Sequence, residues 1–461
     1  MPWLNIGLRR APAQRLVCLA MIDTALHEEA ISLTRDLVRV DSSNPPGNET
    51  PAALVLKRYL ETNGLQCELV ARDPDRANLV ARIPGNGTGP SLALLGHTDV
   101  VPADAQDWQH GPFSGDVDDD GYLWGRGTVD MKNETATRAV AMAVLAREGF
   151  QPNGDLIYIA EADEEDGTHP VGMVWLVGER PDLATDFAIN EGGGDRTVLS
   201  DGRVFVPICV GEKCCLAARV TALGEAGHAS TPNAGANAVP RLATLIERLA
   251  AYRPERRLLP ETRAMLEALI GPFDEDDLDA SLERAATLHS SFPEVIPALF
   301  GITIAPTRLV GSSARNVMPG RASVECDCRI LPGDTPETLE RELRAALGDD
   351  LPYEIEFLEA PVGGTVASVD TPLFGICQSF FDQRDPGAQL LPMVSTGFTD
   401  SHFVRQAYGT AAYGLWPCRH TPSEVLSSGI HNRDERLHVD DLAYGLDFTL
   451  HVCREVGALT G

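Results

Sequence analysis

The sequence predicts an α/β protein with a mixed, largely parallel sheet and an inserted α+β domain. Short apolar runs without polar alternation, typical of strands buried on both faces, alternate with segments of helical period. This alternation builds a largely parallel sheet covered on both sides. A middle stretch instead has the β-α-β-β-α-β order of the ferredoxin-like fold. Because 461 residues exceed one ordinary core, we expect two or three domains.

The first part of the chain contains the alternating pattern. Apolar residues at helical spacing predict a helix over 26–40, and a second helix is expected over 51–63, after the loop SSNPPGNET. Three strand-like runs follow, CELVA, NLVARI and SLALLG. A further helix begins after Asp130 and ends at Gly149, and LIYIA and FAIN then have the composition of buried strands.

The pattern changes after about Val206. Strand CLAARVTAL and a helix over 237–249 lead to strands ITIAPTRLV and ASVECDCRIL, a helix over 335–347 and strand YEIEFLEA. This order predicts a ferredoxin-like unit inserted into the first domain. A helical, acidic, proline-bounded insertion over 254–291 interrupts the unit.

The chain then returns to the first domain, through a helix over 373–381, the loop STGFTDSHF, the loop before His431 and a closing helix over 439–456. The expected division is therefore one domain from 21–208 together with 361–461, and an inserted domain from 209–360.

The net charge argues against two classes of partner. The formal charge is −29, so nucleic acids and anionic membrane surfaces would be repelled. No apolar run reaches the length of about 18 residues that a membrane span requires. The 10 cysteines are scattered without a CxxC pair, which is typical of reduced, mostly buried thiols in a cytosolic protein.

Residues 1–20 precede the first predicted helix. Arg9, Arg10 and Arg15 before LVCLAMI faintly resemble a signal peptide, but the apolar stretch is short and no clear small-residue cleavage site follows. Met21 is a second candidate start of translation. We favour a tail that is added, disordered or not translated over an export signal, and a cytoplasmic location.

Acidic and imidazole groups stand at the ends of apolar runs. They are His97 in LALLGHTDV, Asp130 in GRGTVDMK, the pair Glu164–Glu165 in IAEADEEDG, Glu191 in FAINEGGG and His431 in GIHNRDE. In an open α/β sheet, the carboxyl ends of the strands form the ligand-binding crevice. Carboxylates and imidazoles without cysteine are typical of a catalytic zinc centre rather than a structural one.

Each residue alone has a plainer explanation. His97 could be a surface histidine, Asp130 a helix cap, and the other acids solvated loop residues. Two adjacent carboxylates repel each other unless cations or protons intervene, so one of Glu164 and Glu165 can bind metal while its neighbour faces the activated water. Asp99 lies two residues after His97 on an extended segment, so it points the same way and can accept from the far ring nitrogen.

Seven motifs occur in order along the chain: GHTDVVP, GRGTVDMK, EADEEDG, NEGG, GHASTPNAGANAV, SARNVMPGRASVECDCRILPG and GIHNRDE. Together they resemble the co-catalytic zinc peptidase and amidohydrolase family, which includes aminoacylase, acetylornithine deacetylase, succinyl-diaminopimelate desuccinylase and bacterial glutamate carboxypeptidase. The resemblance covers nearly the whole chain after Met21. It implies a zinc-peptidase catalytic domain, an inserted lid or dimerisation domain and two zinc ions, with cobalt or manganese as alternatives.

The resemblance also implies a role for each strand-end residue. The implied assignments are Asp130 as the bridge between two metal ions, His97 and Glu191 as the other ligands of one ion, Glu165 and His431 as those of the second, Glu164 as the general base and Asp99 as the orienter of His97.

Three residues of the inserted domain receive substrate roles from the same resemblance. His228 would help polarise the scissile carbonyl, often across a dimer interface, and Asn316 and Arg329 would hold the substrate, Arg329 by its carboxylate. Taken alone, His228 is equally a core or turn histidine and Arg329 an ordinary strand arginine. A bidentate arginine–carboxylate contact nonetheless suits a free carboxyl terminus.

We therefore expect a homodimeric hydrolase that cleaves the amide bond of an N-acyl amino acid or dipeptide with a free carboxylate. Two alternatives stay open: a non-catalytic, metal-free binding member, which requires loss of a ligand or of the base, and a carbamoylase-type enzyme on the same scaffold. The chain departs from its relatives at Cys214–Cys215 and at His402, where many carry arginine. The acyl group and side chain preferred are not determined by these patterns.

Overall fold

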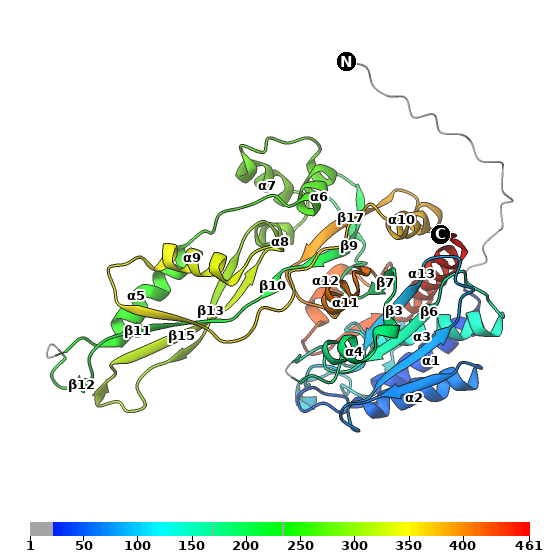
Figure 1. Cartoon of the computed structure of the whole chain (residues 1–461), viewed down its shortest axis with the longest axis horizontal. Coiled ribbons are helices and arrows are strands. Elements are labelled where there is room, and N and C mark those ends of the chain that lie inside the picture. The colour runs from blue at the N-terminus through cyan, green and yellow to red at the C-terminus, as the bar shows by residue number, and fades with distance from the viewer. Residues whose placement is uncertain (1–21, 168, 233–234) are drawn as a thin grey trace, which may run out of the picture.

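The computed structural model describes residues 22–167, 169–232 and 235–461, so the tail predicted over 1–20 lies outside the described residues. The predicted fold class is confirmed: a large mixed sheet lies between two layers of helices, and a second, antiparallel sheet projects from it (Figure 1). Among the described helices, none is long and apolar enough to cross a membrane. The described cysteines are free thiols.

The large sheet has nine strands in the order β1-β2-β6-β3-β7-β18-β9-β17, with β8 paired to β9. Their bounds are β1 (Cys67–Val70), β2 (Asn78–Ile83), β3 (Leu92–His97), β6 (Leu156–Glu161), β7 (Phe187–Asn190), β8 (Thr197–Val198), β9 (Val204–Glu212), β17 (Ala388–Ser395) and β18 (Ala411–Gly414). Strand β3 runs parallel to β6 and β7, β7 to β18, and β9 to β17. The carboxyl ends of β3, β6 and β7 therefore meet at one edge.

Helices cover both faces of this sheet. One face packs against α1 (Thr24–Val38), α2 (Thr50–Thr62), α3 (Lys132–Arg147), α10 (Pro372–Arg384) and α13 (Val439–Ala458), and the other against α4 (Met173–Glu179) and α11 (Ser401–Tyr408). Helix α3 approaches β3 closely because Gly96 has no side chain: a Cβ there would lie 2.6 Å from the Thr135 hydroxyl. This close packing holds the residues before α3 beside the end of β3.

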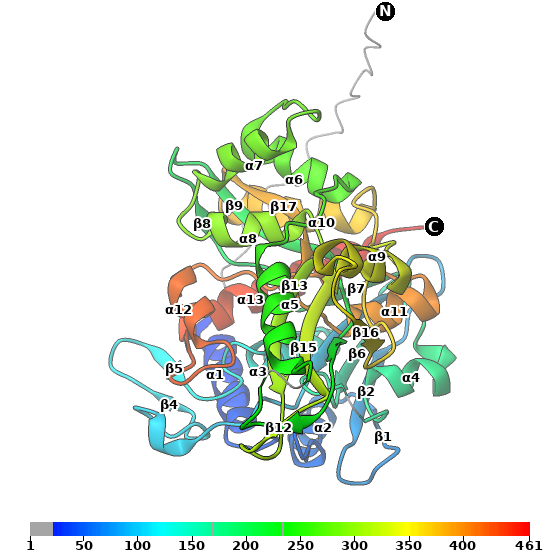
Figure 2. The ribbon, with the colours of Figure 1, turned by 90° about the vertical axis from the view of Figure 1, so that its left-hand side faces the viewer.

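The second sheet has the ferredoxin-like strand order and is antiparallel throughout. It contains β16 (Tyr353–Phe357), β11 (Ala218–Leu223), β15 (Arg321–Ile330) and β13 (Thr303–Val310) in that order, with the short β10 (Cys214–Cys215) also on β15. Helices α5 (Ala238–Ala251) and α9 (Pro336–Leu347) bury its apolar face. In Figure 2 this part of the molecule faces the viewer, with α5 in front.

Short elements complete the fold. A three-stranded sheet has the order β19-β5-β4, and β12 pairs with β14 in a separate ribbon. Their bounds are β4 (Asp116–Val117), β5 (Tyr122–Trp124), β12 (Gly227–His228), β14 (Val317–Met318) and β19 (Arg436–His438), and the helix before His431 is α12 (Ser423–Gly429).

Several features were not predicted from the sequence. Strands β9, β17 and β18 were not predicted; Pro207 and Pro392 lie inside β9 and β17, and proline normally argues against a strand. Helix α11 begins inside STGFTDSHF, which was predicted as a loop. The insertion is helical as expected and forms α6 (Pro260–Ile270) and α7 (Leu278–Ala286). The packing of these helices, together with α8 (Phe292–Leu299), against the large sheet was not predicted (Figures 1 and 2). They share an apolar cluster with Phe205 and Leu391 of that sheet.

Candidate metal centre and active site

Three parallel strands deliver the first candidate side chains to one edge of the sheet. His97 is the last residue of β3, Glu164 and Glu165 follow β6 by a few residues, and Glu191 directly follows β7. Asp130 enters from the turn before α3, and His431 from the turn after α12. Residues separated by more than 300 positions thus contact one another, as the salt bridge of His431 with Asp130 illustrates.

Asp130 lies between two imidazoles and presents one carboxylate oxygen to each. Its Oδ1 is 3.1 Å from His97 Nε2, and its Oδ2 is 3.2 Å from His431 Nε2. Glu191 Oε2 lies 3.7 Å from His97 Nε2 on one side, and Glu165 Oε2 lies 2.9 Å from His431 Nε2 on the other. Asp130 therefore belongs to two clusters of potential metal ligands, each with one histidine and one further carboxylate, whose ligand atoms lie within 4.8 Å of one another.

The electrostatics of these clusters favour cations. Burial raises the pKa of Glu191, and it raises the pKa of Glu165 to about 7, in each case with the charge of Asp130 adding to the effect. Hydrogen bonds to Asp130 and Glu165 raise the pKa of His431 to about 10. Burial opposes protonation of His97, but the charge of Glu191 and the Asp130 contact hold its pKa well above the usual range. Without metal, protons must supply the positive charge that these carboxylates need.

The donor atoms fit a divalent cation such as zinc. Each cluster contributes one imidazole nitrogen and two carboxylates, the ligand types of catalytic zinc sites, and the two clusters contain no thiolate. His431 has a φ of 56°, a left-handed conformation that a residue with a Cβ rarely adopts. Such strain at a residue touching both Asp130 and Glu165 is typical of a functional site.

The adjacent residues Glu164 and Glu165 have different surroundings. The Glu165 carboxylate contacts His431 and accepts from the Val101 backbone N–H at 3.3 Å. The Glu164 carboxylate has no hydrogen bond or ion pair within the described part of the chain, whereas its backbone N–H donates to Asp99. Burial, followed by the charge of Glu191, holds the pKa of Glu164 well above its usual range. Glu164 is thus the carboxylate of the pair that has no partner among the described residues.

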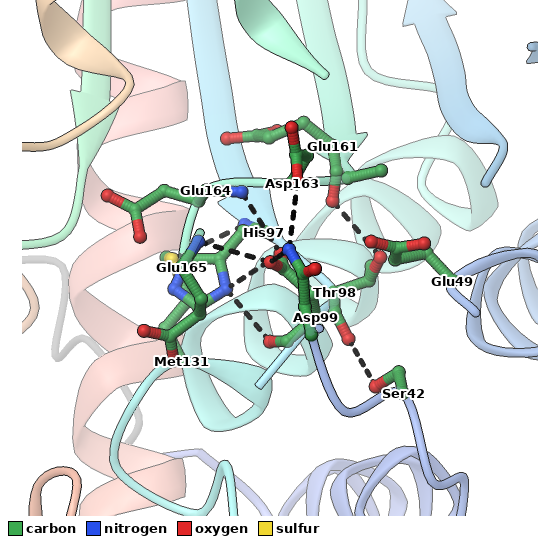
Figure 3. Close-up of polar contacts among 12 residues, drawn as sticks. Ser42, Glu49, His97, Thr98, Asp99, Met131, Glu161, Asp163, Glu164 and Glu165 are labelled. Carbon is green, nitrogen blue, oxygen red and sulfur yellow. Dashed lines mark hydrogen bonds and ion pairs between the residues drawn. The ribbon is translucent and has the colours of Figure 1, made fainter. Parts of the chain in front are cut away.

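Asp99 is positioned behind His97 by several donors (Figure 3). The Nδ1 atom of His97 lies 3.0 Å from the Asp99 carbonyl oxygen and 3.5 Å from its carboxylate. That carboxylate also accepts from Asn44 Nδ2 at 2.9 Å and from the backbone N–H groups of Glu164 and Glu165. The contact expected from the HxD spacing therefore exists, and the backbone carbonyl makes the shorter part of it.

Glu435 has a structural role that the sequence reasoning missed, although it ends the quoted motif GIHNRDE. It is fully buried, and its carboxylate accepts from the backbone N–H groups of Val129 at 2.7 Å and Asp130 at 3.1 Å, and from Arg126 at 2.6 Å. The turn that carries Asp130 is therefore fastened to the loop that carries His431. A glutamate four residues after a candidate ligand was the available signal.

Two further buried acids were also missed. Asp400, just before α11, has a carboxylate oxygen without a hydrogen-bond partner among the described residues, and burial holds its pKa well above the usual range. Glu161, opposite His97 in the sheet register, accepts from the Gly96 N–H at 3.1 Å, and burial raises its pKa to about 8. Neither stood out in the sequence, because a single acid within or after an apolar run is unremarkable.

The three substrate-binding candidates of the inserted part do not join this cluster within one chain. His228 and Asn316 are neighbours, since Ala229 N–H donates to the Asn316 carbonyl at 3.0 Å, but β12 lies at the far end of the molecule from β3 (Figure 1). Arg329, near the end of β15, forms a two-pronged contact with Asp327 at 2.8 and 3.0 Å. His402 is buried on α11, 3.9 Å from Glu212.

A partly buried cluster of imidazoles and carboxylates at the carboxyl ends of the strands of an α/β sheet is typical of a metal-dependent enzyme. The sequence profile described as peptidase family M20/M25/M40 matches residues 93–455. The chain therefore belongs to this family, and it is a metal-dependent amidohydrolase or peptidase.

Curated relatives match over nearly their whole length, and a solved structure shares the fold. A succinyl-diaminopimelate desuccinylase of Rhodopseudomonas palustris is 30% identical over 429 residues, covering 90% of this chain and 94% of the relative. Aminoacylase-1 of Mus musculus is 27% identical over 436 residues, covering 92% and 94%. The crystal structure of an M20 family metallo-carboxypeptidase from Sulfolobus solfataricus superposes with a TM-score of 0.72 at 20% identity, covering 94% of this chain and 100% of that one.

Metal loading is expected to release protons. The imidazoles must be neutral to bind a metal ion, but without metal the raised pKa values of His97 and His431 keep both protonated at pH 7. Zinc binding at pH 7 should therefore release about two protons or more per chain, and the apparent affinity should fall as the pH is lowered. Calorimetry in buffers of different ionisation enthalpy measures this number. Release near zero would contradict the protonated state inferred for the two histidines.

Proposed function

We propose that the protein hydrolyses the amide bond of an N-acyl amino acid or a dipeptide that has a free carboxylate, using two divalent cations, with zinc as the first candidate. The position of Asp130 supports this proposal most directly, because its two carboxylate oxygens face two histidine–carboxylate pairs. In two-metal hydrolases, a pair of metal ions held close together stabilises both the attacking and the leaving atoms. His97, Asp130 and Glu191 would hold one ion, and Asp130, Glu165 and His431 the other.

The residues around the clusters supply proton transfer and orientation. Bound cations of this kind lower the pKa of water and polarise a carbonyl. Glu164, unpartnered and with a raised pKa, accepts the proton of the attacking water and returns it to the departing amine nitrogen. Asp99 holds the ring of His97 through Nδ1, so that Nε2 faces the metal position.

The alternatives are weaker on the described residues. A metal-free binding protein would require loss of a ligand or of the base, whereas both ligand clusters and an unpartnered Glu164 are present. A carbamoylase-type reaction would use the same clusters, and it differs in the acyl group rather than in the metal site. Cobalt or manganese could occupy the same nitrogen and oxygen ligands.

We further propose that the active form is a homodimer joined through the inserted part. The β13 strand is an edge of the second sheet, and it exposes Leu309 to 66% and Val310 to 46%. Val239 and Val317 are also exposed large apolar residues of this part. Unpaired edges with apolar side chains are sites of strand pairing or docking. A second copy of the chain would cover them and could bring His228, remote in its own chain, to the partner's metal site.

Arg329 is the candidate residue for binding the free carboxylate of the substrate. It is partly exposed, and its guanidinium is already engaged by Asp327 and by the Cys215 sulfur at 2.5 Å. A substrate carboxylate would therefore share or replace the Asp327 contact. The planar two-pronged geometry of arginine suits either carboxylate.

Replacing Glu164 and Glu165 by glutamine, one at a time, should distinguish the general base from the metal ligand. Glu164→Gln should keep about two metal ions per chain and lose roughly 10²–10⁴-fold in kcat, the usual share of general base catalysis. Glu165→Gln should instead lose metal, because the amide is a poorer ligand beside His431. Metal analysis and turnover of N-acetyl amino acids measure both. Loss of metal from Glu164→Gln with retention in Glu165→Gln would reverse the assignment.

Complementation tests the role of His228 across a dimer. His228→Ala should cut turnover without changing metal content. Heterodimers of His228→Ala with Glu164→Gln should regain part of the activity, because one of their two sites combines an intact His228 with an intact Glu164. Light scattering establishes the dimer and tagged co-purification its mixed composition. Absence of recovery in demonstrably mixed dimers would mean that His228 does not act in trans.

Arg329→Ala should lower kcat/KM steeply for free acids and much less for the same substrates amidated at the carboxylate. A charge-assisted pair left without its partner typically costs a few kcal/mol. Arg321→Ala is the matched control, since Arg321 lies at the other end of β15 and pairs with Glu354. Equal wild-type turnover of acid and amide forms would remove carboxylate recognition.

A further inference from the structure

A cavity of about 230 Å³ adjoins the metal-ligand candidates Asp130 and Glu191. It is smaller than the roughly 300–1,000 Å³ of sites that enclose a whole small ligand, so it can accommodate one substituent of a substrate. Apolar walls come from Met393, Trp416 and Leu426, all supplied by the lobe of the large sheet. The candidate residues for the substrate carboxylate belong to the inserted part instead, so this cavity faces the acyl side of the scissile bond.

The cavity lining is acidic and has no basic side chain. Its charged members are Asp130, Glu191, Glu134 and Asp195. Glu134 pairs with Arg138 behind the wall at 2.6 Å, and metal ions would neutralise Asp130 and Glu191. Asp195 is the acid of this cavity whose negative charge is not balanced by a partner, since its carboxylate has no hydrogen bond or ion pair among the described residues. A partly buried carboxylate without a donor costs free energy that a cationic ligand would offset.

Asn133 provides a second, independent indication of a ligand. It lines the same cavity, is only 1% exposed, and its Oδ1 has no hydrogen-bond partner in the described structure. The two ends of an asparagine amide exchange by a flip of the last torsion, so Asn133 can present an acceptor to a bound donor. An aliphatic chain that ends in an ammonium group matches the apolar walls and these acceptors together.

We propose that this cavity binds the acyl-side substituent of the substrate and selects an alkylammonium chain, as in a lysine- or ornithine-like group, over neutral or anionic chains. The proposal rests on the proposed amide hydrolysis for its orientation. Asp195 supplies the charge, Asn133 a further acceptor, and Trp416 and Met393 the contact for the methylene groups. An anionic acyl group would meet the unpaired Asp195 carboxylate and be rejected.

Matched acyl groups test the selection. The substrates are 6-aminohexanoyl-, heptanoyl- and adipoyl-alanine, which carry a positive, a neutral and a negative chain end at nearly equal length, with 4-aminobutanoyl- and pentanoyl-alanine as a shorter pair. The zinc-loaded wild type should favour each ammonium chain over its neutral isostere by about 10- to 100-fold in kcat/KM, the usual effect of a hydrogen bond to a charged group. The adipoyl compound should be poorest.

Asp195→Asn should bring the ammonium-to-neutral ratio close to one, with Asp195→Ser as a second variant in case the first folds poorly. The control Asp201→Asn changes an exposed aspartate paired with Arg203 and should keep the wild-type ratio. Metal content is measured for each protein. A wild-type ratio of one or less, or an unchanged ratio in both Asp195 variants, would overturn the proposal.

Product binding separates this proposal from the proposed function. By calorimetry, the zinc-loaded protein should bind 6-aminohexanoate more tightly than heptanoate, and both Asp195 variants should lose the difference. If no acyl-alanine is hydrolysed, amide hydrolysis fails as the function, and the binding difference still decides the cavity. Hydrolysis without any preference, together with equal binding of the two acids, would overturn the cavity alone.

Discussion

The sharing of one carboxylate between two imidazoles organises this molecule. Asp130 contacts His97 and His431 through different oxygens. Asp130 lies in the turn before α3, His97 at the end of the central strand β3, and His431 in the loop after α12. Burial disfavours the ionised form of this carboxylate, and positive charge on both sides of it, supplied by protons or by metal ions, favours that form. The requirement links the electrostatics of the site to the packing of three distant segments.

The surrounding fold serves this arrangement through backbone groups as much as through side chains. Glu435 accepts the N–H groups of the Asp130 turn from the loop that carries His431, so neither segment can shift without exposing buried donors. Gly96 lets α3 pack against β3 at a distance that no side chain would permit. Asp99 receives the N–H groups of Glu164 and Glu165 and thereby connects the end of β6 with the end of β3.

The two lobes hold different parts of the proposed substrate site. The large lobe holds the candidate metal ligands, Glu164 and an acidic cavity, whereas the inserted part holds His228, Asn316 and Arg329. Its sheet also carries an exposed apolar edge at β13. The substrate proposed above, with a cationic acyl chain and a free carboxylate, has charges of opposite sign at its two ends, and an acidic cavity and an arginine would be their respective complements.

The sequence by itself determined the local elements and the ligand types. Buried parallel strands such as β3, β6 and β7 are runs without polar alternation, and a histidine or carboxylate at their ends is visible because it interrupts apolar residues. Only the tertiary structure decided which distant residues meet. The Glu435 anchor, the placement of α6 and α7 on the large sheet, the proline-containing strands β9 and β17, and the cavity at Asp195 all depend on contacts between segments far apart in the chain. Local periodicity does not predict such contacts, because they depend on packing and buried hydrogen bonding in the folded chain.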